Sequence, residues 1–343
     1  MYDLIFFYSS INRGGSELAL LRYLKNTTKK ENTLVVYYKD TSDLEMIKEF
    51  QNVVEVKKLE PDEVVSTKNV VNCMISTTES TIFDKVKAEK YILWVQVNPE
   101  FYSNYRDFEK YDSFLTTSEY IKGITLKHES VKGKKVFLAN PIVDMEEIRQ
   151  KGEESQDVLS DDEINIVSIA RVCKNKGYDY MVEIANRLKK RNIDFKWYML
   201  GFISYRDEEY YKSLLEKIEN YDLKDNIIFM GAHENPYKFL KHAYMSVLLS
   251  NDEAWGLAVT ESKALAVPPI ASNNSGLKEQ IVSGENGYLV DLPETEEEYE
   301  AIVDMMQELI DNKELYSQMV ENLRGIKDNV PEIVKTMDEC FHQ

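Results

Sequence analysis

Short apolar runs alternate with amphipathic segments along nearly the whole chain, and this pattern restricts the fold more than any other feature. In the first half the runs have the length and composition of buried strands: Leu4–Tyr8, Leu34–Tyr38, Val53–Val56, Val70–Ile75, Tyr91–Val95, Phe114–Thr117 and Val136–Leu138. Segments with helical periodicity lie between several of them, such as Ser16–Leu24 and Glu119–His128. Strands that alternate with helices predict βαβ units and a parallel sheet.

The pattern is interrupted by a charged stretch, residues 145–162, and then restarts. The second set of strand-like runs is Ile164–Ile169, Phe195–Leu200, Ile227–Met230, Met245–Leu249, Pro269–Ala271 and Gly287–Val290. The helical segments are Tyr178–Arg191, Glu208–Asn220, Leu257–Ala266 and Thr295–Asp311. We therefore expect an α/β protein with two doubly wound, Rossmann-like domains, residues 1–144 and 163–325, joined by a linker over 145–162 and facing a cleft. Residues 326–343 are expected to form a helix that crosses back to the first domain.

Composition excludes several classes of protein. The formal net charge is −18 over 343 residues, which argues against a general nucleic-acid binder, because such proteins need clustered Lys and Arg. The acidic excess lies mainly in residues 151–343. The three cysteines are widely spaced and predict neither a disulfide framework nor a zinc site. The N-terminus lacks a signal-peptide pattern, and no apolar window is long enough to span a membrane, so we expect a cytoplasmic protein.

Gly14 and Gly15 follow the first expected strand and precede a helix. Paired glycines let a ligand approach backbone N–H groups at a helix N-terminus, where anions are favoured. An ordinary strand-to-helix turn would use the same residues. The motif is neither G-x-G-x-x-G nor a Walker A loop. The main sequence support for a dinucleotide-binding site or a P-loop NTPase site is therefore missing.

Two loops in the second half carry charged residues where strands end. Arg171 and Lys176 follow one strand, and two cations there suit a diphosphate, although a solvated basic loop is an equally simple interpretation. Glu253 follows another strand, and Glu261 lies one turn into the next helix. The residues at that helix start, Gly256-Leu257, would offer backbone N–H groups. Together these groups predict a nucleotide-sugar site, while isolated glutamates alone are weak evidence.

These motifs, in this order, resemble the retaining, GT-B-fold glycosyltransferases of the sucrose-synthase-like family 4, also called glycosyl transferases group 1. The second half carries five motifs of that family: Ser168…Arg171…Lys176-Gly177, Phe229-Met230-Gly231, Glu253…Glu261, Pro268–Gly276 with Glu279, and Asn286–Val290. The first half is similar more loosely, through Gly14-Gly15-Ser16-Glu17 and Asn140–Asp144. The resemblance covers nearly the whole chain and is strong from about residue 164 to 291.

The resemblance implies roles for individual residues. Arg171 and Lys176 would hold the donor diphosphate, Glu253 the hydroxyls of the donor sugar, Glu261 the ribose, and Gly15 the phosphate through its backbone. The catalytic residues expected are Glu253, Arg171 and Lys176. The donor-binding residues expected are Gly14, Gly15, Gln96, Arg171, Lys176, Gly256, Leu257 and Glu261. One departure is Gln96, which stands where many members carry a histidine; glutamine can hydrogen-bond a hydroxyl but cannot carry a proton charge.

The activity implied is a retaining hexosyltransferase of class EC 2.4, without metal or cofactor. It would move a sugar from a nucleotide diphosphate donor, a UDP-sugar by family, to a saccharide, lipid-linked or protein acceptor in bacterial surface glycan or glycoconjugate synthesis. Two alternatives stay open. One is a non-catalytic partner subunit that binds acceptor for a sister enzyme, which Gln96 favours, and the other is a sugar-nucleotide epimerase on the same fold.

Two further segments could face ligands. The aromatic residues of 101–111 suit sugar stacking on the acceptor side, but core packing explains them as well. The segment Lys122–Lys135 holds five lysines and one acid, Glu129. Such a patch predicts peripheral contact with an anionic membrane at its inner face, or else a plain solvated surface.

Overall fold

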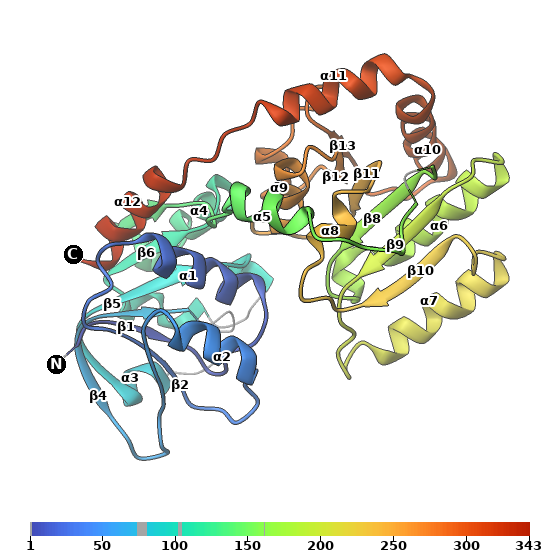
Figure 1. Ribbon diagram of the computed structural model, residues 1–343. Helices are drawn as coiled ribbons and strands as arrows, with labels where there is room; N and C mark the ends of the chain where they lie inside the picture. The colour runs from blue at the N-terminus through green and yellow to red at the C-terminus, as the bar shows by residue number, and fades with distance from the viewer. Residues whose placement is uncertain (1, 74–80, 102–104, 161) are drawn as a thin grey trace. The chain divides into compact units, whose positions relative to one another are not determined.

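The structure is a computed structural model that describes residues 2–73, 81–101, 105–160 and 162–343 (Figure 1). Ile75, the expected end of one strand, lies outside these ranges. The chain forms two compact units. Unit 1 comprises Met1–Val143 and Asn329–Gln343, and unit 2 comprises Asp144–Asp328.

Within the described ranges, unit 1 contains a parallel sheet of seven strands. They are β1 (Tyr2–Phe7), β2 (Thr33–Tyr37), β3 (Glu55–Lys58), β4 (Val65–Asn72), β5 (Val86–Val95), β6 (Ser113–Thr116) and β7 (Lys135–Leu138). Their order is β3-β2-β1-β4-β5-β6-β7, and every pair is parallel. The helices are α1 (Gly15–Asn26), α2 (Leu44–Gln51), α3 (Thr81–Lys85), α4 (Glu119–Leu126) and α12 (Val330–Phe341). A strand overlaps each run that the sequence predicts as a strand in this half of the chain.

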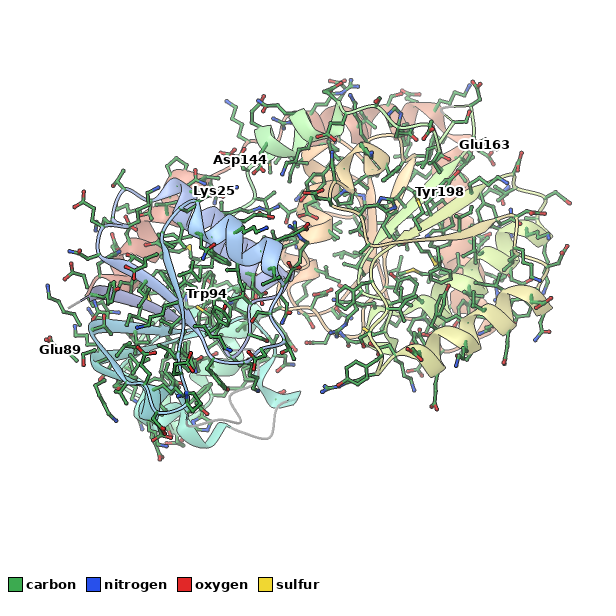
Figure 2. The ribbon with its side chains drawn as sticks, turned by 60° about the horizontal axis from the view of Figure 1, so that its bottom comes forward. Lys25, Glu89, Trp94, Asp144, Glu163 and Tyr198 are labelled. Carbon is green, nitrogen blue, oxygen red and sulfur yellow. The ribbon has the colours of Figure 1, made fainter. Side chains whose placement is uncertain are left out.

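The C-terminal helix α12 completes the core of unit 1. Figure 1 shows it, in red, beside α1 and the sheet. Phe341 is fully buried, and its ring contacts those of Phe6, Tyr23 and Trp94 at centroid distances of 5.2, 5.2 and 5.8 Å. Trp94 lies in the interior of unit 1 (Figure 2). The Asp338 carboxylate accepts a hydrogen bond of 2.8 Å from the Tyr23 hydroxyl, so polar contacts also fix the helix.

Unit 2 contains a second parallel sheet, of six strands in the part of the chain that is described. They are β8 (Asn165–Ile169), β9 (Lys196–Leu200), β10 (Ile227–Gly231), β11 (Met245–Leu248), β12 (Pro269–Ser272) and β13 (Tyr288–Val290). Their order is β10-β9-β8-β11-β12-β13. The helices are α5 (Met145–Gly152), α6 (Tyr178–Lys190), α7 (Glu208–Asn220), α8 (Tyr237–Leu240), α9 (Leu257–Ala264), α10 (Glu296–Asp311) and α11 (Lys313–Arg324).

The start of the expected linker is a helix. Residues 145–152 form α5, whose first turn is capped by the Asp144 side chain, which accepts a hydrogen bond of 2.9 Å from the Glu147 amide. Met145 and Ile148, three residues apart, are buried, and α5 packs on α8 and α9 within unit 2. The high charge of this segment predicted a linker, and for residues 145–152 that prediction is wrong. Two apolar residues at helical spacing are enough to bury one face of a short helix.

The strand orders place two loops at topological switch points. In unit 2 the order reverses between β8 and β11, and in unit 1 between β1 and β4. Doubly wound sheets bind ligands at the carboxyl ends of the strands beside such a point. The loop from 170 to 177 follows β8, the loop from 249 to 256 follows β11, and the glycine loop 8–14 follows β1.

Candidate functional site

Backbone and side-chain hydrogen bonds hold the loops after β8 and β11 together. The Asn251 amide donates to the Asn175 carbonyl at 2.8 Å. The Asn175 side chain donates to the Asp252 carbonyl at 3.1 Å. Two segments 77 residues apart in sequence therefore form one rigid surface at the switch point of unit 2.

The centre of this surface is an ion pair between Lys176 and Glu253. The Lys176 ammonium donates to Oε1 of Glu253, and the Ser250 hydroxyl donates to the same oxygen at 3.1 Å. Both charged side chains are mostly buried, with 20% and 15% of their surface exposed. Burying two charges is costly, and each keeps the other from being an uncompensated buried charge. The structure thus brings together the expected diphosphate cation and the expected sugar-binding carboxylate.

Two glycines shape the site. Gly177 has φ +67°, and a Cβ there would lie 2.0 Å from the Leu249 carbonyl oxygen. Gly256 has φ +85°, and its Cβ would lie 2.4 Å from Cδ2 of Leu277. Side chains are therefore excluded at both positions by space and by the left-handed backbone. Gly177 lets α6 start directly after Lys176, and Gly256 lets α9 start at Leu257.

The turn after β12 is hydrogen-bonded to the loop that carries Glu253. The Gly276 amide donates to the Glu253 carbonyl at 2.8 Å, and the Asn274 side chain donates to the Ser250 carbonyl at 2.7 Å. Gln280 reaches the start of α9: its amide donates to the carbonyl of Gly256 at 3.3 Å. Sequence reasoning missed Asn274 and Gln280 as positioning residues. The available signal was that Asn274 lies within the Pro268–Gly276 motif and that Gln280 directly follows Glu279.

Glu261 and Arg171 lie in different surroundings. Glu261 is only 6% exposed, and its Oε1 accepts a hydrogen bond of 2.9 Å from the Tyr237 hydroxyl. Tyr237 begins α8, after β10, so Glu261 is tied to the β10 side of the sheet. Arg171 is exposed and follows the end of β8 by two residues.

The expected residues of unit 1 lie at the carboxyl ends of β1 and β5. Gly14 and Gly15 begin α1, and Glu17 is buried beneath them. Burial raises the pKa of the Glu17 carboxyl, although hydrogen bonds from Ser16 and from backbone amides partly oppose that rise. Gln96 directly follows β5, and its Nε2 is buried with no hydrogen-bond partner among the residues described.

The lysine-rich segment is only partly available to ligands. Lys134 donates to the carbonyls of Phe108, Glu109 and Tyr111 at 2.9, 2.9 and 2.6 Å, so its ammonium group is engaged within the protein. Three other lysines, Lys127, Lys132 and Lys135, are exposed. Membrane contact through Lys122–Lys135 stays a prediction, which cosedimentation with anionic vesicles would test. In the described part of the chain, no helix is long and apolar enough to cross a membrane.

Of the aromatic residues of 101–111, Phe108 and Tyr111 are buried, with 2% and 3% of their surface exposed. Both rings contact Phe114, which agrees with core packing for these two residues. The side chains of Phe101, Tyr102 and Tyr105 lie outside the described part. Among the described residues, no group of three or more His, Cys, Asp or Glu side chains could hold a metal ion.

A family model, glycosyl transferases group 1, matches residues 150–325, slightly more than half of the chain. The chain belongs to this family. An uncharacterized glycosyltransferase of Methanocaldococcus jannaschii is 25% identical over 275 residues, which are 73% of this chain and 66% of the relative. The N-acetyl-alpha-D-glucosaminyl L-malate synthase of Bacillus anthracis is 26% identical over 166 residues, 48% of this chain and 41% of the relative. The matches thus span less than two thirds of these relatives.

Solved structures share the fold over the full length of the chain. Anabaena HepE, in complex with UDP and glucose, has a TM-score of 0.79 at 14% identity, with 99% of both chains covered. The lipopolysaccharide outer core galactosyltransferase WaaB has a TM-score of 0.68 at 12% identity, again over 99% of both chains. The α/β fold expected from the sequence, that of the GT-B group 1 glycosyltransferases, is confirmed.

Proposed function

We propose that this protein is a retaining glycosyltransferase that takes a sugar from a nucleotide diphosphate donor, a UDP-sugar. The observation that carries the proposal is the Lys176–Glu253 pair at the switch point of unit 2. A cation for phosphate and a carboxylate for sugar hydroxyls lie side by side there, as a sugar diphosphate requires. Family membership supports the reaction class, and HepE complexes with UDP and with UDP-glucose support the donor class.

In this proposal, charge stabilisation drives the reaction. The acceptor hydroxyl attacks the anomeric carbon, the bond from that carbon to the diphosphate oxygen breaks, and UDP leaves with the electron pair. Negative charge grows on the diphosphate, where Arg171, Lys176 and the first N–H groups of α9 stabilise it. A donor phosphate oxygen takes the acceptor's proton. Glu253 binds sugar hydroxyls, and Glu261 binds the ribose.

Unit 1 has proposed donor contacts of its own. Gly14 and Gly15 present backbone N–H groups to phosphate, and the buried Nε2 of Gln96 donates to a hydroxyl of the sugar. A buried amide with no partner is costly, and a ligand oxygen would satisfy it. We propose a saccharide, lipid-linked or protein acceptor and a cytoplasmic location at the inner face of the membrane, in synthesis of bacterial glycans. No metal or cofactor takes part, because the two cations neutralise the diphosphate.

Release of UDP from a panel of UDP-sugars, with and without acceptors, tests the function. We expect slow hydrolysis of one donor without acceptor, faster release with the right acceptor, and unchanged rates in EDTA. Abolition by EDTA would overturn the metal independence. Absence of release from any UDP-, GDP- or ADP-sugar would favour the partner-subunit function, which rests on glutamine at position 96.

Lys176→Ala should weaken UDP binding about tenfold or more, because a hydrogen bond to a charged group contributes about 1.5–3 kcal/mol. The variant should still fold but unfold at a lower temperature, because Glu253 is left without its cation. Calorimetric titration of UDP measures the change. Lys174→Ala is the matched control, because Lys174 is exposed on the same turn, and its UDP affinity should equal that of the wild type. Equal affinity of the Lys176 variant would remove the diphosphate from this loop.

A further inference from the structure

The start of α1 is capped in an unusual way. Its N-cap residue is Gly14, which offers no side-chain hydrogen bond. Instead, Glu17 in the first turn reaches back. Its Oε1 accepts a hydrogen bond of 3.2 Å from the Asn12 amide, and its Oε2 accepts one of 2.6 Å from the Ser16 hydroxyl. The carboxylate therefore fastens the loop before the helix to the helix itself.

The same carboxylate accounts for Gly14. The φ of Gly14 is −134°, an extended value that any residue adopts, so backbone strain does not select glycine here. A Cβ at this position would lie 2.9 Å from Oε2 of Glu17. Because Glu17 is only 7% exposed and is held by two hydrogen bonds, its carboxylate could move only by breaking them. Glycine is needed for the space that the carboxylate occupies.

Among the residues that the structure describes, none gives Glu17 a counter-charge. Tyr8 faces it from the end of β1, and Cys73 faces it from the end of β4. Burial raises the pKa of both groups, so both are neutral. A buried carboxylate without a cation is costly, unlike the Lys176–Glu253 pair of unit 2. The hydrogen bonds from the Asn12 amide and the Ser16 hydroxyl partly offset this cost.

We propose that Glu17 is a positioning residue that fixes the path of the glycine loop and so directs the first N–H groups of α1 toward the donor phosphate. Gly14, which has no Cβ, leaves the space that this carboxylate requires. The inference rests on the proposed function for its ligand, but its structural part concerns unit 1 alone. Backbone N–H groups that are already held in place lower the entropic cost of binding a ligand. The loss of Glu17 should therefore raise the KM for the sugar donor more than it lowers kcat.

A double-mutant cycle on Gly14 and Glu17 tests this coupling. Gly14→Ala should raise the donor KM about tenfold in the wild-type background and less than about twofold when Glu17→Ala is already present, because the clash is then gone. Glu17→Gln keeps an acceptor oxygen for the Asn12 amide and should stay within about twofold of the wild-type KM. Gly123→Ala is the matched glycine control, since its Cβ would meet no atom within 4 Å, and it should leave the donor KM unchanged.

Thermal unfolding of the same variants needs no donor and separates the two claims. The unfolding temperature should show the same non-additivity, whether or not the protein transfers sugar. Additive losses of unfolding temperature would overturn the role of Glu17 even if the wild type releases UDP. A Gly14→Ala variant that unfolds at the wild-type temperature would do the same. Non-additive unfolding with an unchanged donor KM in an active enzyme would overturn the phosphate-directing role. Absence of UDP release by the wild type would overturn the proposed function, and with it that role.

Discussion

Glu253→Gln should lower the rate of sugar transfer about 10- to 100-fold and leave UDP affinity unchanged or slightly increased. The substitution keeps the shape of the side chain and removes its charge, and a charged hydrogen bond contributes about 1.5–3 kcal/mol. UDP lacks the sugar that Glu253 is proposed to bind, so its affinity does not depend on that contact. Moreover, Lys176 loses its carboxylate partner and becomes more available to phosphate.

The measurement is kcat and KM for the donor, beside calorimetric affinity for UDP. Glu209→Gln is the matched control: Glu209 is exposed on α7, and its variant should behave as the wild type. Full turnover by the Glu253 variant, or a large loss of UDP affinity with unchanged kcat, would place the sugar elsewhere. The first outcome would leave the diphosphate assignment intact, since Lys176→Ala tests that separately.

The strands could be predicted because their apolar runs are short, separated and bounded by polar residues. β10, for example, covers Ile227–Gly231 where the sequence indicates Ile227–Met230. Short helices were harder. α2 spans Leu44–Gln51 and went unrecognised, because its buried residues Met46, Ile47 and Phe50 are few and its neighbours are charged. Length and a clear apolar stripe are what make a helix visible in one sequence.

The chemistry of the site was visible only as separate residues. Lys176 and Glu253 were each expected near a donor, but their ion pair depends on which strands are neighbours, since β8 and β11 are adjacent in space and not in sequence. Gln280 carries no motif of its own, and its role follows from where its amide reaches. Contacts between loops at one sheet edge are set by topology, which periodicity does not report.

The last helix leads to the largest expected change in stability. Phe341→Ala should lower the free energy of unfolding of unit 1 by about 3–5 kcal/mol, the usual cost of removing a buried phenylalanine ring. Phe341 has 0% exposure and contacts three aromatic rings, so its loss leaves a cavity that rigid neighbours cannot close. That loss is a large fraction of the roughly 5–15 kcal/mol that stabilises a domain.

Hydrogen exchange read by mass spectrometry can follow each unit by its own peptides. In Phe341→Ala, peptides of β1 and α1 should exchange much faster, while peptides of β8 and α6 should keep wild-type protection, because Phe341 belongs to unit 1. Phe202→Ala is the matched control: this phenylalanine is 48% exposed in unit 2, and its truncation should change protection little. Unchanged exchange in β1 and α1 would mean that α12 adds nothing to the core of unit 1, against the packing of its aromatic ring.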